Sequence, residues 1–87
     1  MNDIILLRKK LLYRSLHRGC KETDILLGRF AAKFIDHFSD YELGEYEKIV
    51  DLDDHELYCY ITSKQAVPIS LNSNIISSII KFNSSFY

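Results

Sequence analysis

Hydrophobic residues recur at intervals of three and four positions along most of this chain. This spacing places them on one face of an α-helix, whereas a half-buried strand would need alternation. Glycine and proline, the residues that most often interrupt helices, are scarce, at three and one in 87 residues. The pattern therefore predicts an all-α fold, a compact bundle of about five short helices joined by tight connections.

The first predicted helix covers residues 3–16, with Asn2 or Asp3 as its N-cap. The chain leaves this helix at Gly19, because glycine readily adopts the left-handed conformation that closes a helix. The predicted apolar stripe is wide and comprises Ile4, Ile5, Leu7, Leu11, Leu12 and Leu16.

The second predicted helix begins near Glu22 or Thr23, where acidic side chains suit the positive end of the helix dipole. Gly28 lies within this helix and is expected to allow close packing of a neighbouring helix. The expected core face comprises Leu27, Phe30, Ala31, Phe34 and Phe38, with Leu26 and Ile35 on its flanks.

Capping boxes mark the later helices. The Ser-x-x-Glu sequence at residues 39–42 predicts the start of a third helix that runs to about Asp51. A weaker box at residues 53–56 opens a fourth helix, and a fifth covers residues 71–82, after a loop that contains Pro68. The expected buried residues of these helices are Leu43, Tyr46, Ile49, Val50, Leu57, Tyr58, Tyr60, Ile61, Leu71, Ile75, Ile76, Ile79, Ile80 and Phe82.

The composition adds a division of charge to this picture. A chain of 87 residues has room for one core, so residues 1–87 are predicted to form a single domain. Residues 1–33 carry eight basic and three acidic side chains, whereas residues 34–60 carry nine acidic and one basic. Such a surface suits a protein partner with matching patches better than a nucleic acid, which usually binds a basic domain. We expect no nucleic-acid binding, and a monomer when the protein is free.

The sequence also argues against membrane insertion and extracellular folding. Its first apolar run, Ile-Ile-Leu-Leu, is broken by three basic residues and is far shorter than the ~20 residues that span a bilayer. Two cysteines, Cys20 and Cys59, do not make a disulfide framework, so a reduced, cytosol-like compartment is predicted. We expect no signal peptide and no transit peptide.

Metal binding and catalysis are possible alternatives for the cysteines and histidines. His17 and Cys20, and His55 and Cys59, could form two half-sites with ligand types that suit zinc. Their spacing does not match the known zinc motifs, and cysteine is also a common core residue. The glycines are isolated, so no phosphate-binding loop is present. We therefore predict no metal site, no catalytic residue and no enzyme.

The stretch HRGCKETD, residues 17–24, holds the most varied chemistry of the chain, at the corner between the first two helices. Arg18 and Glu22 lie four positions apart and could form a local ion pair worth about 0.5 kcal/mol or less. Alternatively, Gly19 lets another protein approach closely while both charged side chains hydrogen-bond to that partner. The spacing alone leaves both alternatives open.

Three segments resemble the SdhE/Sdh5 family of succinate dehydrogenase assembly factors. RGCKETD matches the R-G-x-x-E-x-D signature of that family at Arg18, Gly19, Glu22 and Asp24. Residues 52–61, LDDHELYCYI, resemble its D-x-x-L-x-x-W-L segment, and FSDYE resembles the start of its third helix. Because the three segments occur in the family's order, the combination is more specific than the short signature alone.

The resemblance implies a five-helix protein that binds the flavoprotein subunit of succinate dehydrogenase, and in some bacteria that of fumarate reductase. Members promote the covalent attachment of FAD to a histidine of this client, so FAD is implied on the client and not on this chain. The resemblance places Arg18, Gly19 and Glu22 on the surface that meets the client, with Asp24 in support. We expect the protein in the bacterial cytoplasm.

Two departures from the family pattern qualify the resemblance. His17 replaces the first arginine of the family's Arg-Arg doublet, which makes one expected charge contact with the client pH-dependent. Tyr60 and Ile61 replace its Trp-Leu pair, a change that keeps an aromatic side chain in the core. Some relatives are described as antitoxins that act on cytoskeletal assembly. The alternative function is therefore a regulatory protein-binding module without a role in flavin attachment.

Overall fold

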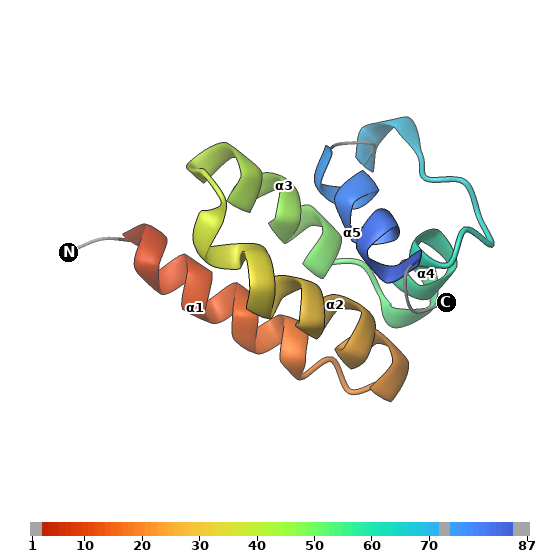
Figure 1. Cartoon of the computed structure of the whole chain (residues 1–87), viewed down its shortest axis with the longest axis horizontal. Coiled ribbons are helices and arrows are strands. Elements are labelled where there is room, and N and C mark those ends of the chain that lie inside the picture. Colours follow the sequence, from red (N-terminus) through yellow and green to blue (C-terminus); the bar gives the residue numbers. More distant parts are fainter. Residues whose placement is uncertain (1–2, 72–73, 85–87) are drawn as a thin grey trace.

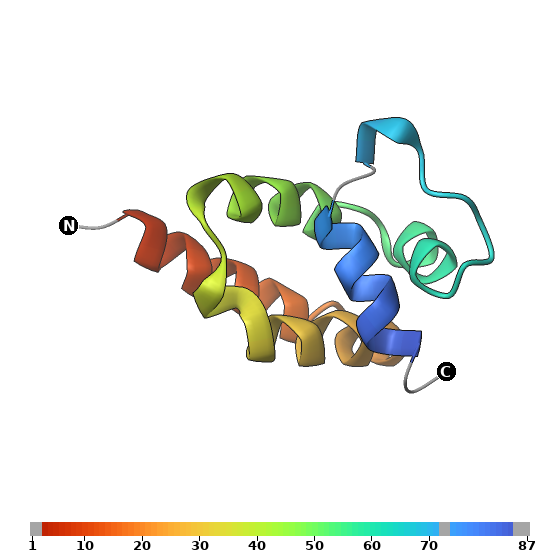
Figure 2. The ribbon, with the colours of Figure 1, turned by 45° about the horizontal axis from the view of Figure 1, so that its top comes forward.

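Two helices of equal length form the base of the structure, a computed structural model that describes residues 3–71 and 74–84. Helix α1 spans Asp3–Leu16, as predicted, and α2 spans Lys21–Phe34. The two lie side by side as a hairpin in both views (Figures 1 and 2). A Cβ atom added at Gly28 would lie 2.8 Å from Leu16 Cδ2, which confirms that this glycine allows the close packing of α1 on α2.

Both ends of α2 differ from the prediction. The helix begins at Lys21, one or two residues earlier than expected, after an extended Cys20 at the N-cap whose side chain makes no capping hydrogen bond. The sequence therefore offered no polar capping residue to mark this start. The α-helix ends at Phe34 and continues as a short 3₁₀-helix, η1, at Ile35–His37. Phe38 is buried as predicted, but it is extended and lies outside the helix.

Helices α3, Asp40–Val50, and α4, Asp54–Ile61, confirm the two capping predictions. The Ser39 hydroxyl accepts a hydrogen bond from the Glu42 backbone N–H, and the Glu42 carboxylate accepts one from the Ser39 N–H. Asp53 likewise accepts the Glu56 N–H at 2.8 Å. These contacts satisfy amides that a helix start leaves without partners, which explains why both starts could be read from the sequence.

Helix α5, Asn74–Ser84, crosses from the α3 side of the molecule to the α2 side and packs against α2, α3 and α4 (Figure 2). The prediction of a helix over residues 71–82 was wrong at its start, because Leu71 belongs to a separate 3₁₀-helix, η2, at Ile69–Leu71, directly after Pro68. At the other end, the buried Asn83 donates hydrogen bonds to the Leu26 and Ile79 carbonyls. The first of these bonds ties α5 to α2.

The buried core agrees with most of the predicted helix faces, and the clearest differences are on α1. Several other residues predicted for the core are only half-buried and pack against it: Phe34, Tyr58, Leu71, Ile80 and Phe82. Ile5 and Leu16 were expected in the core but are 50% and 42% exposed. Helix α1 packs mainly on α2, α3 and η1, so one side of the wide apolar stripe is left uncovered. In the described residues all regular structure is helical, and no helix there is long and apolar enough to cross a membrane. The buried hydrophobic residues are Leu11, Leu26, Leu27, Phe30, Ala31, Ile35, Phe38, Leu43, Tyr46, Ile49, Val50, Leu57, Tyr60, Ile61, Ile75, Ile76 and Ile79.

Candidate functional site

The corner between α1 and α2 is an exposed turn built around Gly19. This glycine has φ +88°, which confirms the predicted left-handed conformation, and a Cβ atom at this position would have no neighbour within 4 Å. The His17 N–H still donates to the Tyr13 carbonyl at 3.0 Å, and the two rings stack with centroids 4.3 Å apart. The backbone at the corner is thus open to solvent, and His17 is exposed beside it.

Asp24 closes the corner from the α2 side. Its carboxylate accepts a hydrogen bond from the Arg18 backbone N–H, and its own N–H donates to the Cys20 carbonyl at 2.9 Å. The carboxylate also lies in the first turn of α2, where the helix dipole favours a negative charge. Asp24 therefore helps to fix the shape of the corner.

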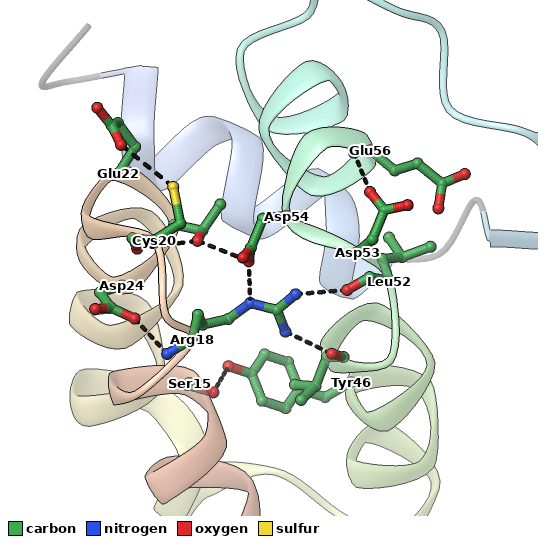
Figure 3. Close-up of polar contacts among 12 residues, drawn as sticks. Ser15, Arg18, Cys20, Glu22, Asp24, Tyr46, Leu52, Asp53, Asp54 and Glu56 are labelled. Carbon is green, nitrogen blue, oxygen red and sulfur yellow. Dashed lines mark hydrogen bonds and ion pairs between the residues drawn. The ribbon is translucent and has the colours of Figure 1, made fainter.

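The Arg18 side chain turns away from solvent and toward the junction of α3 and α4 (Figure 3). Its guanidinium donates to the Val50 carbonyl and to the Leu52 carbonyl, both at 2.5 Å, and to Asp54 Oδ1 at 2.9 Å. Carbonyls at the end of a helix lack partners within the helix, so Arg18 satisfies acceptors that α3 leaves free. With only 8% of its side chain exposed, Arg18 ties the corner to the other half of the molecule.

Asp54 is a residue of this site that the sequence analysis did not single out. Its Oδ1 accepts hydrogen bonds from Arg18 and from the Thr23 hydroxyl, the latter at 2.9 Å, so one carboxylate holds both sides of the corner. In the sequence analysis, Asp54 was included only among the nine acidic side chains of residues 34–60 and within the weaker capping box at residues 53–56. The available signal was its place in the segment LDDHELYCYI, where it matches the aspartate of the family pattern.

Glu22 faces solvent, in contrast to Arg18. The predicted alternative of a local Arg18–Glu22 ion pair is wrong in the described structure, because Arg18 pairs with Asp54 instead. The Glu22 carboxylate accepts the Cys20 thiol at 3.3 Å. A hydrogen bond from its own backbone amide, aided by that thiol, holds the pKa of Glu22 below its ordinary value. Glu22 therefore presents an ionised carboxylate at the start of α2.

An open hollow of about 410 Å³ lies beside Glu22, between the start of α2 and helix α4. Next to it, His55 Nε2 and Cys59 Sγ are 3.7 Å apart on α4. In the residues that the structure describes, no three His, Cys, Asp or Glu side chains are placed to hold a metal ion, so the two half-sites do not combine. The hollow is lined by Cys20, Glu22, Asp54, His55 and Tyr58.

A buried polar pair supports the corner from below. The Tyr46 hydroxyl of α3 lies 2.5 Å from the Ser15 hydroxyl of α1, which also donates to the Leu11 carbonyl (Figure 3). Burial raises the pKa of Tyr46 well above its ordinary value, although Ser15 and the positive charge of Arg18 oppose the shift. Tyr46 is therefore neutral, and the floor of the corner is packed and fully hydrogen-bonded at this point.

An exposed turn that is held rigid from inside, with an open backbone and an ionised carboxylate beside it, is suited to recognition by another protein. The fold and this site define the chain as a small helical protein-binding module. The sequence profile of the Sdh5 family, described as flavinator of succinate dehydrogenase, matches residues 9–83. The chain therefore belongs to the Sdh5 family, which is a family of assembly factors and not of enzymes, and the resemblance carried by the three segments is confirmed.

Proteins named succinate dehydrogenase assembly factor 2, mitochondrial, are similar to this chain. The one from Scheffersomyces stipitis is 40% identical over 60 residues, which are 69% of this chain and 40% of that protein. The one from Kluyveromyces lactis is 35% identical over 80 residues, which cover 87% of this chain and 49% of that protein. The one from Dictyostelium discoideum is 33% identical over 79 residues, which cover 91% of this chain and 56% of that protein. The chain thus spans roughly half the length of these relatives.

Proposed function

We propose that this protein binds the flavoprotein subunit of succinate dehydrogenase and promotes the covalent attachment of FAD to that subunit. The flavoprotein of fumarate reductase is a second expected client. The proposal is supported by family membership and by one structural observation, the solvent-facing corner of Gly19 and Glu22 that buried contacts of Arg18 hold in place. The relatives are named mitochondrial, whereas the bacterial cytoplasm stays our prediction for this chain.

The corner itself does not fit an FAD site. The diphosphate of FAD is an anion, and the hollow beside the corner presents the ionised Glu22 carboxylate together with Asp54. The isolated glycines also provide no loop of backbone amides that could bind phosphate. FAD is therefore assigned to the client, and this chain acts on the conformation of the client.

The mechanism that follows is conformational selection. A helper protein accelerates a reaction within its client by binding preferentially to the conformation in which the reacting groups are close together. A binding surface serves this purpose best when it is rigid. A flexible surface would lose conformational entropy on binding, and this loss would offset part of the binding free energy. Arg18, Asp24 and Asp54 provide the rigidity from inside, while Gly19 and Glu22 remain available for contact.

Covalent flavin on the client provides the test. The chain would be co-expressed with a succinate dehydrogenase flavoprotein subunit in cells that lack their own helper, and flavin fluorescence would be measured on a denaturing gel. We expect a fluorescent band with the wild type and with Ile69→Ala, a matched control at a 92% exposed position in η2. We expect the band to be lost with Gly19→Arg, whose long side chain would block the corner.

The result against the proposal would be the absence of a band with the folded wild-type protein and a cognate client. Recovery of a filament protein with the chain, in place of a flavoprotein, would then favour the antitoxin-like alternative. A band of equal strength with Gly19→Arg would retain the function but remove the corner from it.

A further inference from the structure

Exposed hydrophobic side chains are concentrated on α1. Six large hydrophobic residues are more than 40% exposed in the described structure, and four of them, Ile5, Leu6, Tyr13 and Leu16, belong to this helix. Single exposed hydrophobic residues are normal on a protein surface, whereas several on one helix indicate a contact surface. The concentration on α1 therefore needs an explanation that the core does not provide.

Most of these side chains lie along one side of the helix, together with basic residues. This side, here called the outer α1 face, consists of Leu6, Lys9, Lys10, Tyr13, Leu16 and His17, all of which are exposed. Their spacing of three and four positions is that of a single helical face. The face contains no acidic residue, so it combines apolar area with positive charge.

The basic side chains on the outer α1 face differ from the other two on the helix. Arg14 pairs with Asp51 at 2.8 Å, and Arg8 donates to the Phe38 carbonyl at 2.6 Å. Within the described part of the chain, neither Lys9 nor Lys10 forms an ion pair. Their charges are thus available to an acidic partner, whereas the arginines contribute to the fold.

The outer α1 face is continuous with the corner. Its last member, His17, precedes the Arg18–Gly19 turn directly and stacks on Tyr13, so the two rings connect the helix face to the turn. Figure 1 shows α1 at the edge of the molecule, on the side away from α5. A partner that covers the corner could therefore extend along α1 without meeting another element.

We infer that the flavoprotein client binds the outer α1 face as well as the corner, and that the contact area on the client is acidic, with apolar recesses for Leu6 and Tyr13. This inference rests on the proposed function. Continuity with the corner and the unpaired lysines argue for this occupant, since a protein interface combines buried aromatic anchors with complementary charge at its edge.

Binding to a purified succinate dehydrogenase flavoprotein subunit, measured by calorimetry, tests the inference. We expect the double variant Leu6→Ser with Tyr13→Ser to weaken binding by roughly tenfold or more, because it removes the central apolar anchors. We expect Lys9→Glu with Lys10→Glu to weaken binding as well, and more strongly at low salt than at high salt.

The chain offers two controls for this experiment: exposed hydrophobic residues outside α1, and the stability of the α1 variants themselves. Tyr41, which is 76% exposed on α3, and Ile69 on η2 are exposed hydrophobic residues outside α1, so their change to serine should leave the dissociation constant as in the wild type. The α1 side chains to be changed are exposed, and thermal unfolding of each variant should therefore stay at the wild-type midpoint.

The possible failures can be distinguished. If Glu22→Ala weakens binding while both α1 variants bind as the wild type does, the inference is overturned and the proposed function stands. If the wild type does not bind the flavoprotein, both are overturned. Loss of binding to vesicles of anionic phospholipid in the α1 variants, with flavoprotein binding unchanged, would assign the face to a membrane surface and overturn the inference. Concentration-dependent dimers that disappear in the same variants would assign it to a second copy of the chain, with the same consequence.

Discussion

At the corner between α1 and α2, two charged side chains of one motif lie in opposite surroundings. Arg18 is 8% exposed, and its guanidinium is hydrogen-bonded to two carbonyls and one carboxylate from the other half of the chain. Glu22, four positions later, is exposed, and within residues 3–71 and 74–84 its hydrogen bonds are those of its own turn. The arginine therefore maintains the shape of the corner, and the glutamate is available for contact with a partner.

The difference follows from the chemistry of the two groups. A planar guanidinium has five donors and can satisfy several fixed acceptors at once, which offsets the cost of removing its charge from water. A carboxylate at this position would need hydrogen-bond donors as neighbours. The end of α3 and the loop after it instead direct two carbonyl oxygens toward it. A charged residue within a recognition motif need not contact the partner, because it can hold the residue that does.

The largest expected effect comes from removing the inner residue. Arg18→Ala leaves the Val50 and Leu52 carbonyls and the Asp54 carboxylate without their partner, so we expect the free energy of unfolding to fall by about 3 kcal/mol. Urea unfolding followed by circular dichroism measures it. Arg18→Lys should retain only a small part of the stability lost in Arg18→Ala, since an ammonium group cannot donate to all three acceptors with the planar geometry of a guanidinium. An unchanged unfolding midpoint in Arg18→Ala would contradict the structural role.

Removal of the outer residue should affect binding much more than stability. Glu22→Ala is expected to lower the binding free energy for the flavoprotein by about 1–3 kcal/mol, because it deletes a charge-assisted contact. The unfolding midpoint should fall only slightly, because the exposed carboxylate gives up one hydrogen bond from its own backbone amide at the start of α2. Calorimetric titration provides the affinity, with Asp36→Ala, an exposed acidic position in η1, as the matched control. Equal affinities for the wild type and Glu22→Ala would contradict the assignment.

The floor of the corner predicts a pH effect. In the unfolded chain Tyr46 ionises near its ordinary pKa of 10.0, whereas in the folded protein it stays neutral because burial raises its pKa. Above pH 10 the unfolded state thus binds fewer protons, and stability should fall by up to about 1.4 kcal/mol per pH unit. Tyr46→Phe should remove this contribution.

The measurement is the difference in unfolding free energy between wild type and Tyr46→Phe from pH 8 to pH 11. The two proteins share every other ionisable group, so the contributions of those groups cancel in the difference. A difference that does not change with pH would indicate that Tyr46 is not kept neutral by its surroundings.

The smallest expected effects are those of alanine substitutions at two glycines, which test the backbone conformation of the turn. Both Gly19 and Gly44 have open space where a Cβ atom would lie, but only Gly19 has a positive φ. Gly19→Ala should therefore cost about 1–2 kcal/mol through backbone strain. Gly44→Ala lies inside helix α3 and should stabilise the protein by about 0.5–1 kcal/mol. Thermal unfolding measures both, and changes of the same sign would refute the distinction.

Local patterns predicted much of the fold. Both predicted helix starts, at residues 39–42 and 53–56, were confirmed, the first with a complete capping box and the second with the N-cap hydrogen bond of Asp53. They could be predicted because such caps are formed by side chains and amides within four residues. The bounds of α1 and the conformation of Gly19 were also confirmed, and the resemblance in three segments led to the correct family. The start of α2 was missed because Cys20 does not cap it with its side chain.

The sequence by itself determined the all-α class, the main helices and the family, because these depend on periodicity, capping and short motifs that are local in the chain. Only the tertiary structure decided that Arg18 faces inward to Asp54, a partner 36 positions away, and that Glu22 faces outward. It also decided that Ile5 and Leu16 remain exposed on α1. Which side of a helix is covered depends on where other helices pack, and local spacing carries no information about that.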